Sequence, residues 1–282
     1  MNNIVYYSYK KSKYDHVNDH ELKRFDHSIS SLRKFNNEIP VYLFCDDPEL
    51  IPPYFSLEYD VRVLPFEKAH THGMLFIYRW FNLKHFGEAN ILYVDSDTLF
   101  YGDVQYLFDH YNYAKVFGRE EFGFRHDPNT GGGKGIRKAL DYVDQCITEA
   151  GGSTHVYKYC MGVMLFNNGL HLDIIDRSGE LVELMLKIKD RKIPYPVPNP
   201  RIYDEYAMWV ILSRIGVIGG LFGIQDVTQG YIEQKHKEFF NPIVMHYTTK
   251  GEQQLAQDDE RYSNLLRDVD EYSEQIDPFH LL

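Results

Sequence analysis

Two carboxylates stand one residue apart in the segment ILYVDSDTLF, residues 91–100, directly after four apolar residues. If a strand over 91–94 continues through them, Asp95 and Asp97 project to the same side about 7 Å apart, while Ser96 turns away. One divalent cation fits between two such groups, and hard carboxylate oxygens suit Mg²⁺ or Mn²⁺. The pair falls where an apolar strand ends, which is where parallel α/β sheets bind ligands. The structural alternative is a solvated turn, since Asp, Ser and Thr are ordinary strand-ending residues.

The net charge indicates what a cation at this position would do. The chain has 282 residues and a formal net charge of −11. No dense stripe of Lys and Arg interrupts this acidity, so general affinity for nucleic acid or an anionic membrane is not expected. An anionic ligand such as a pyrophosphate therefore needs a local cation, which would also stabilise a departing nucleoside diphosphate.

The elements that must position the acidic pair follow an α/β pattern. Short apolar runs predict strands, and longer segments with helical periodicity alternate with them, which is typical of a mostly parallel sheet flanked by helices. The predicted strands cover 4–7, 41–44, 61–64, 91–94, 113–117, 163–166 and 243–246. The predicted helices cover 21–35, 75–86, 136–149, 178–190, a segment from about 204, and 251–277.

The helix predicted over 21–35 has the clearest pattern. Its apolar residues recur at steps of three and four, so one stripe can pack on the sheet. The stripe consists of Leu22, Phe25, Ile29, Leu32 and Phe35.

Cysteine usage and hydropathy bear on the compartment. Cys45, Cys146 and Cys160 are widely spaced and odd in number, which fits neither a disulfide framework nor a zinc cluster and predicts a reducing cytoplasm. No stretch approaches the roughly 18 apolar residues that span a bilayer. We therefore expect a soluble, cytoplasmic protein without an integral membrane segment.

The segment ILYVDSDTLFYGDVQYLFD, residues 91–109, resembles the Asp-x-Asp segment of GT-A glycosyltransferases. It is most similar to glycosyltransferase family 8, the glycogenin and galactosyltransferase group. The resemblance covers most of the chain and implies a single GT-A domain over 1–282. Within it, 1–110 would bind the nucleotide, 111–250 the sugar and acceptor, and 251–282 would form a helical segment.

The same resemblance implies an activity. Members of that family transfer a hexose from a nucleotide-sugar donor, usually UDP-linked, with a divalent metal, and they retain the anomeric configuration. The cofactor would be Mn²⁺ or Mg²⁺. The acceptor hydroxyl would belong to a glycan, a lipid-linked sugar, a small molecule or a protein Tyr.

The late segment PIVMHYTTKG, residues 242–251, is similar to the family's metal-completing His and the Lys that follows it. By resemblance, His246 joins Asp95 and Asp97 on the metal, and Lys250 reaches the diphosphate, although it lies closer to the His than in the usual spacing. Asp95 and Ser96 would also face the donor. A lone His at a strand end otherwise reads as an ordinary hydrogen-bonded residue.

Other donor contacts are implied along the chain. Arg79 matches a basic residue that faces the diphosphate, and the alternative is an Arg on a helix surface. The loop after the first strand, Tyr7 to Tyr9 with Ser8 between them, would hold the base and ribose. Gly162, in MGVMLFNNG (161–169), would let the sugar approach the backbone, or simply serve a buried strand. Cys160 stands where the family has a sugar-contacting Asn.

The segment YDEYAMWVIL, from residue 203, resembles the family's Asp-Gln segment near the reacting sugar. The resemblance makes Asp204 and Glu205 the candidate catalytic residues, although Glu205 replaces the family's Gln. Asp204 is also a natural helix N-cap.

Two other classes compete with this interpretation. Phosphatases of the haloacid dehalogenase type place Asp-x-Asp-x-Thr after an apolar strand, with the first Asp as nucleophile, here Asp95 beside Asp97. In that class the motif normally ends the first strand, whereas three predicted strands precede it here. A non-catalytic nucleotide-sugar-binding protein is the third possibility, favoured by Cys160 and Glu205.

Overall fold

The four apolar runs in the first third of the chain form strands, as predicted. The computed structural model describes residues 1–9, 11, 14–66, 82–120, 144–145, 148, 157, 159–177, 203–217, 219–229 and 242–247. The four strands are β1 (Asn2–Tyr9), β2 (Val41–Cys45), β3 (Val61–Pro65) and β4 (Ala89–Val94). They pair in parallel, with β1 between β2 and β4.

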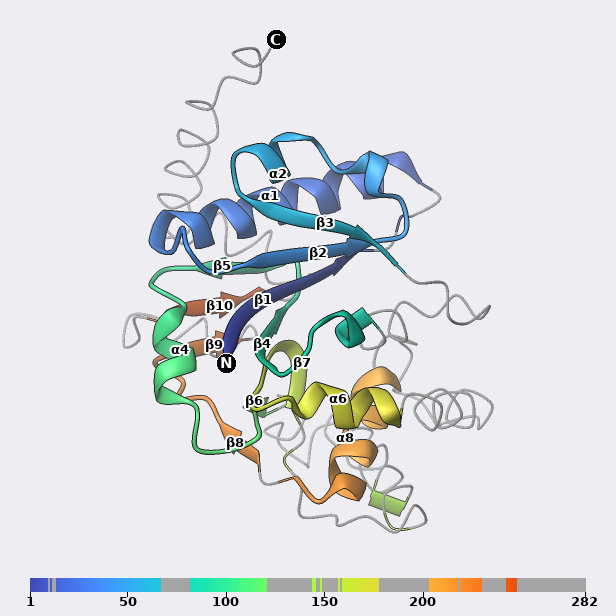
Figure 1. The fold of residues 1–282 in the computed structure, drawn as a ribbon, viewed down its shortest axis with the longest axis vertical. Helices are drawn as coiled ribbons and strands as arrows, with labels where there is room; N and C mark the ends of the chain where they lie inside the picture. Colours follow the sequence, from blue (N-terminus) through green and yellow to red (C-terminus); the bar gives the residue numbers. More distant parts are fainter. Residues whose placement is uncertain are drawn as a thin grey trace, which may run out of the picture.

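A seven-stranded, mostly parallel sheet forms the centre of the molecule (Figure 1). The remaining strands are β6 (Val116–Glu120), β7 (Tyr159–Phe166) and β8 (Gly219–Leu221), and the order is β3-β2-β1-β4-β7-β6-β8. Strand β7 is antiparallel to both of its neighbours, and the other pairs are parallel. The predicted fold class is therefore confirmed.

A second, three-stranded sheet was not predicted as such. It consists of β5 (Thr98–Phe100), β10 (Val244–His246) and β9 (Val227–Gln229), in the order β5-β10-β9. Strand β5 follows the acidic pair directly and is antiparallel to β10. This small sheet joins the acidic segment to the late His segment of the chain.

The longest helix is α1 (Asp15–Phe35), and most of the predicted stripe packs as expected. Phe25, Ile29 and Leu32 are buried and Leu22 is partly buried, but Phe35, the last residue of the helix, is exposed. The other described helices are α2 (Tyr54–Leu57), α4 (Gln105–His110), α6 (Leu170–Asp176), α8 (Tyr203–Ile215), and the 3-10 helices η1 (Pro48–Leu50) and η2 (Asn82–His85).

Several predicted boundaries differ from the structure. The strand predicted over 113–117 begins only at Val116, and 111–115 are bends and irregular backbone. In place of the helix over 75–86, residues 82–85 form the short η2, and the rest of that prediction lies outside the described residues. The predicted helices over 178–190 and 251–277, and almost all of 136–149, also lie outside them.

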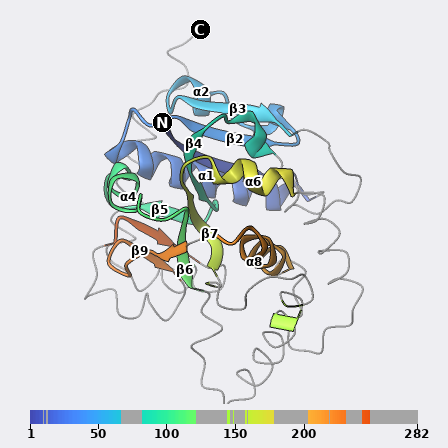
Figure 2. The same ribbon diagram turned by 60° about the horizontal axis from the view of Figure 1, so that its bottom comes forward.

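The core has two parts, one on each face of the large sheet. Val5, Tyr7 and Tyr9 of β1 pack with α1, whereas Ile4 and Tyr6 pack on the face covered by α6, α8 and η2. Figure 2 shows α6 and α8 close to each other beside β7. Burial on both faces explains why β1 and β4 read as continuous apolar runs rather than alternating ones.

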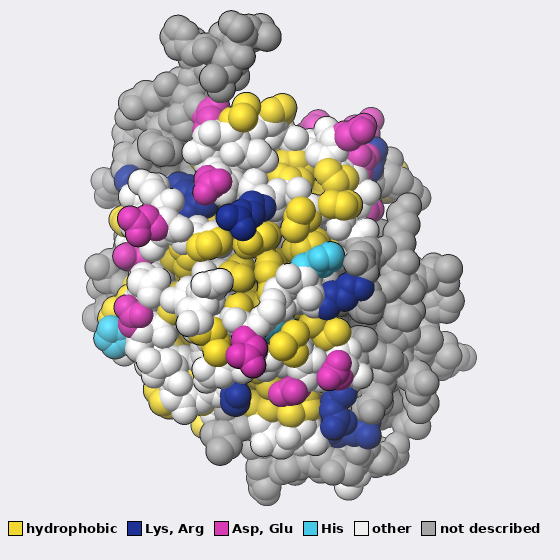
Figure 3. All heavy atoms as spheres, in the orientation of Figure 1, with side chains coloured by type: hydrophobic (Ala, Val, Ile, Leu, Met, Phe, Trp, Pro, Cys, Tyr) yellow, Lys and Arg dark blue, Asp and Glu magenta, His cyan; other side chains and the backbone are white. Residues whose placement is uncertain are grey.

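The surface seen in Figure 3 mixes apolar and charged side chains. Apolar side chains lie across the middle of this face, and acidic and basic side chains are interspersed around them. Among the helices that the structure describes, none combines the length and apolarity needed to cross a bilayer.

Candidate active site

Asp95 and Asp97 lie in a turn between β4 and β5. The predicted strand stops at Val94, and residues 95–97 bend before β5 starts at Thr98. The backbone N–H of Asp95 donates to the carbonyl of Gly162 at 2.8 Å, and that of Tyr247 donates to the carbonyl of Asp97 at 2.7 Å. The two carboxylates are therefore placed by a turn anchored to β7 and to the end of β10, and not by strand alternation.

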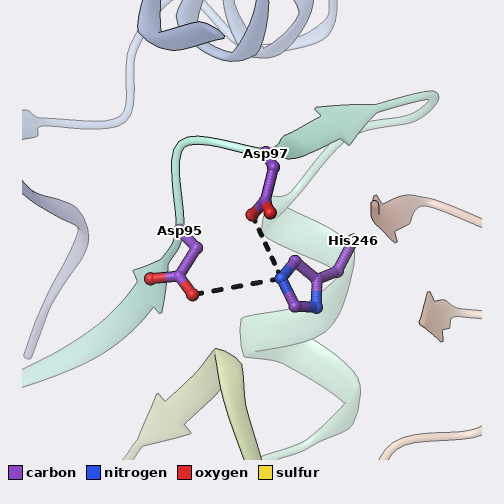
Figure 4. A group of neighbouring side chains, drawn as sticks. All are labelled: Asp95, Asp97 and His246. Atoms are coloured by element: carbon purple, nitrogen blue, oxygen red, sulfur yellow. Dashed lines mark ion pairs between the residues drawn. The ribbon is translucent and has the colours of Figure 1, made fainter. Parts of the chain in front are cut away.

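His246 completes a cluster with these carboxylates (Figure 4). It is the last residue of β10, and the antiparallel register sets it opposite Thr98, next to Asp97 in the chain. Its Nε2 lies 3.1 Å from Oδ1 of Asp97 and 3.9 Å from Oδ2 of Asp95. The imidazole is buried, and the two carboxylates are partly buried.

Gly162 of β7 packs against the imidazole ring of His246. A Cβ atom built on Gly162 would lie 2.1 Å from Cε1, 2.4 Å from Nε2 and 2.5 Å from Nδ1 of His246. No real carbon atom approaches that closely, so the ring occupies space that only glycine leaves open. Gly162 therefore packs directly against His246. Its predicted contact with the donor sugar stays a prediction.

The electrostatics favour an ionised carboxylate at Asp97. Burial by itself raises the pKa of Asp97. The neighbouring His246 and the charge of Arg24 on α1 lower this pKa by more than burial raises it, so the net pKa lies below the usual value. Arg24 is held by Glu21, whose Oε1 accepts from Nη1 at 2.8 Å. An anionic Asp97 is the protonation state that a metal ligand requires.

The three side chains lie close enough together to be candidate ligands of one divalent cation. Neighbouring ligands of such an ion lie about 3 Å apart and opposite ones about 4.2 Å, given bonds of roughly 2.1 Å. One ligand atom from each residue lies within 4.8 Å of the other two. Oδ1 of Asp97 is buried and makes no well-directed hydrogen bond, although Nε2 of His246 is 3.1 Å away. Asp95, Asp97 and His246 would be the residues that hold such an ion, and water and ligand oxygens would supply its other ligands.

The middle residue of the acidic turn is tied to α1. Ser96 Oγ donates to Oε2 of Glu21 at 2.8 Å, so Glu21 bridges Ser96 and Arg24. Local sequence patterns do not predict a role for Glu21 or Arg24, because their position beside the turn depends on how α1 lies over it. The donor role expected for Ser96 stays a prediction.

The residues expected to hold the base differ in exposure. Tyr7 is fully buried in the core, and its hydroxyl lies 2.9 Å from Ser28 Oγ. Neither face of its ring is therefore open to a base. Tyr9 is also buried, and its hydroxyl donates to Asn18 Oδ1 at 2.7 Å. Ser8 is half-buried on the opposite face of β1, and its Oγ has no hydrogen-bond partner among the described residues.

Four other predicted residues are only partly placed or not placed. Arg79 and Lys250 lie outside the described residues. Asp204 and Glu205 belong to the first turn of α8, and their side chains are outside the description. Their predicted roles stay predictions.

Comparison by sequence yields no match: no family model matches the chain, and no curated protein does. Comparison by structure finds matches to solved glycosyltransferase structures. GlyE of Streptococcus pneumoniae TIGR4, a glycosyltransferase, matches with a TM-score of 0.53 and 16% identity over 96% of this chain. The bifunctional glycosyltransferase WbbM matches with a TM-score of 0.56 and 14% identity over 88% of the chain. The chain spans only 64% of GlyE and 46% of WbbM.

Two further solved structures match over most of their own length. The galactosyltransferase LgtC, solved with donor and acceptor sugar analogues, has a TM-score of 0.52 and 11% identity, with 86% of each chain covered. Mouse xyloside xylosyltransferase 1 has a TM-score of 0.52 and 11% identity, with 89% of this chain and 99% of that one covered. At such low identity the likeness defines the fold and nothing finer. The chain has the GT-A fold of these glycosyltransferases, including those of family 8, as the sequence resemblance predicted.

Proposed function

We propose that the chain is a metal-dependent glycosyltransferase that moves a hexose from a UDP-sugar to an acceptor hydroxyl with retention of configuration. The observation that carries the proposal is the convergence of Asp95, Asp97 and His246 in one cluster within a GT-A fold. Asp95 directly follows β4, at the carboxyl end of a strand in the parallel half of the sheet. Ligands bind at such ends in open α/β sheets.

The chemistry of the cluster supports this reaction class. When bound, a divalent cation supplies positive charge to a diphosphate leaving group. The carboxylates of Asp95 and Asp97 and the imidazole of His246 hold that charge in place in a chain whose formal net charge is −11. Arg79 and Lys250 are proposed to face the same diphosphate, and Asp204 and Glu205 to lie near the reacting sugar.

The donor nucleotide is proposed to lie along the ends of β1 and β4. Ser8, near the end of β1, has a buried hydroxyl oxygen without a partner among the described residues, which suits a polar ligand. Ser96 and Gly162 complete the proposed donor contacts. Because Tyr7 is fully buried and Tyr9 nearly so, base recognition by hydrogen bonds rather than by stacking on these rings is the form that we propose.

The donor sugar is the least constrained part of the proposal. The similar structures include a galactosyltransferase and a xylosyltransferase, so both hexose and pentose donors occur among them. Cys160, where the family has a sugar-contacting Asn, is a buried residue of β7, two positions before Gly162. A thiol is a weaker hydrogen-bonding group than an amide, and we propose that sugar selection differs here for that reason.

A phosphatase of the haloacid dehalogenase type is disfavoured by the topology. In that class the Asp-x-Asp motif normally ends the first strand, whereas here it follows β4, the fourth strand along the chain. Nε2 of His246 also lies within 4 Å of both carboxylates, and an Asp nucleophile does not need an imidazole at this position. A pure nucleotide-sugar binder shares the fold and the cluster, so an assay must separate it from an enzyme.

We expect UDP and Mn²⁺ together to raise the melting temperature more than either raises it alone. A ligand at 100 times its dissociation constant stabilises the folded state by about 2.7 kcal/mol, or several degrees for a chain of this size. Thermal melting with UDP, Mn²⁺, both, and ADP plus Mn²⁺ as the base control measures this effect. Equal shifts for UDP with and without Mn²⁺ would contradict the metal-dependent donor site.

The same samples can then be assayed for chemistry. Slow release of UDP from UDP-glucose, UDP-galactose or UDP-xylose that depends on Mn²⁺ would identify a transferase and its donor. Hydrolysis of p-nitrophenyl phosphate without sugar-nucleotide turnover would identify a phosphatase instead. Binding of UDP with no turnover of either substrate would identify the binding protein.

A further inference from the structure

The hydroxyl of Tyr93 contacts one of the two acidic residues of the cluster. Tyr93 lies on β4 two positions before Asp95, and its hydroxyl donates a hydrogen bond to Oδ1 of Asp95. The ring is fully buried. It packs against Tyr6, with 5.7 Å between ring centroids, and the backbones of Tyr93 and Tyr6 are paired in the sheet. A ring held this firmly has little freedom to move its hydroxyl away from the carboxylate.

The two oxygens of Asp95 consequently have different surroundings. Oδ1 accepts from Tyr93, whereas Oδ2 is the oxygen 3.9 Å from Nε2 of His246. Figure 4 shows the same division: one oxygen of Asp95 is directed toward His246, and the other points away from the cluster.

We infer that Tyr93 makes Asp95 a one-oxygen metal ligand and thereby selects small octahedral ions over Ca²⁺. Mg²⁺ and Mn²⁺ take six ligands at short distances and use one oxygen per carboxylate readily. Ca²⁺ prefers six to eight oxygens at 2.3–2.6 Å and commonly takes both oxygens of a carboxylate. Engaging Oδ1 from behind removes one oxygen that a larger ion would use, which makes Tyr93 a positioning residue that does not itself touch the ion. This inference rests on the metal site of the proposed function.

The decisive change is Tyr93→Phe, which removes the hydroxyl and keeps the ring. Mn²⁺ and Ca²⁺ are titrated as the metals alone, with no donor, by calorimetry and by electron paramagnetic resonance of free Mn²⁺. We expect the Mn²⁺-over-Ca²⁺ preference to fall about tenfold, since removing a group that orients a ligand typically changes metal affinity by 10- to 100-fold.

The matched control is Tyr59→Phe. Tyr59 is also fully buried, and its hydroxyl donates to a carboxylate oxygen, Oδ1 of Asp26, at 3.0 Å, but it packs in the other core, near α1 and α2. Its loss should leave the ion preference unchanged. If both variants keep the wild-type preference, the inference about Tyr93 is overturned while the metal site stands. If the wild-type chain binds no Mn²⁺, the proposed metal site itself is overturned.

A measurement on the unaltered chain covers the case in which Tyr93→Phe does not fold. A crystal structure with Mn²⁺ should show Asp95 bound through Oδ2 alone, with Oδ1 still accepting from Tyr93. Coordination through both oxygens of Asp95, or a Tyr93 hydroxyl turned away from it, would overturn the inference.

Discussion

Asp97→Asn is expected to abolish metal-dependent turnover while leaving the fold intact. The amide is nearly the same size as the carboxylate but lacks the charge that binds a divalent cation. Asp97 supplies the oxygen nearest to His246, 3.1 Å from Nε2, so it is central to the cluster. Without the cation, we expect the transition state to lose about 4 kcal/mol of charge stabilisation, which corresponds to about a thousandfold loss of rate.

The measurement is Mn²⁺-dependent release of UDP from the best donor, together with Mn²⁺ titration of the free protein. Asp109→Asn is the matched control, because Asp109 carries the same chemical group on the exposed surface of α4. The control should keep wild-type turnover and metal affinity. Full Mn²⁺-stimulated activity in Asp97→Asn would refute the assignment of this carboxylate as a ligand.

Gly162→Ala is expected to weaken metal binding strongly without changing any of the proposed ligands. The added Cβ would lie 2.1 Å from Cε1 of His246, so the imidazole or the β7 backbone must move. Either movement separates Nε2 from the two carboxylates, and we expect Mn²⁺ affinity to fall by about 100-fold. Overpacking of this kind also costs about 1–3 kcal/mol of stability, measurable as a lower melting temperature.

Gly87→Ala provides the control for the glycine change. A Cβ at Gly87 meets no atom within 4 Å, so that variant should keep both metal affinity and melting temperature close to wild type. The effect of Gly162→Ala on Mn²⁺ affinity should also be non-additive with that of His246→Ala, because both changes act through one ring. Fully additive losses, or unchanged affinity in Gly162→Ala, would contradict the placement of His246 as a ligand.

Tyr93 and Glu21 differ in how far sequence could have pointed to them. Tyr93 stands on β4 only two residues before Asp95, so their contact is local in the chain, although Asp95 lies beyond the end of the strand at Val94. Glu21 lies 75 positions before Ser96, on a helix that packs over the turn. No local spacing indicates that contact, because it depends on the placement of α1.

The boundaries of the small strands show a second limit. Strands β5, β8, β9 and β10 have three residues each, which is too short for a period of two to stand out from a turn. Only the apolar run at 243–246 drew attention to one of them. Yet β5 and β10 form the pair that carries His246 to the acidic turn, so the least readable elements decide the site.

The sequence by itself determined the α/β class, the long helix α1, the central strands and the position of Asp95 and Asp97 at a strand end. These features are local: apolar residues at periods of two and 3.6 must bury one or both faces, and acidic residues end such runs. Resemblance, rather than pattern, pointed to His246. Only the tertiary structure decided that the three side chains share a cluster, because the register of β5 with β10 and the space left by Gly162 arise from strands far apart in the chain.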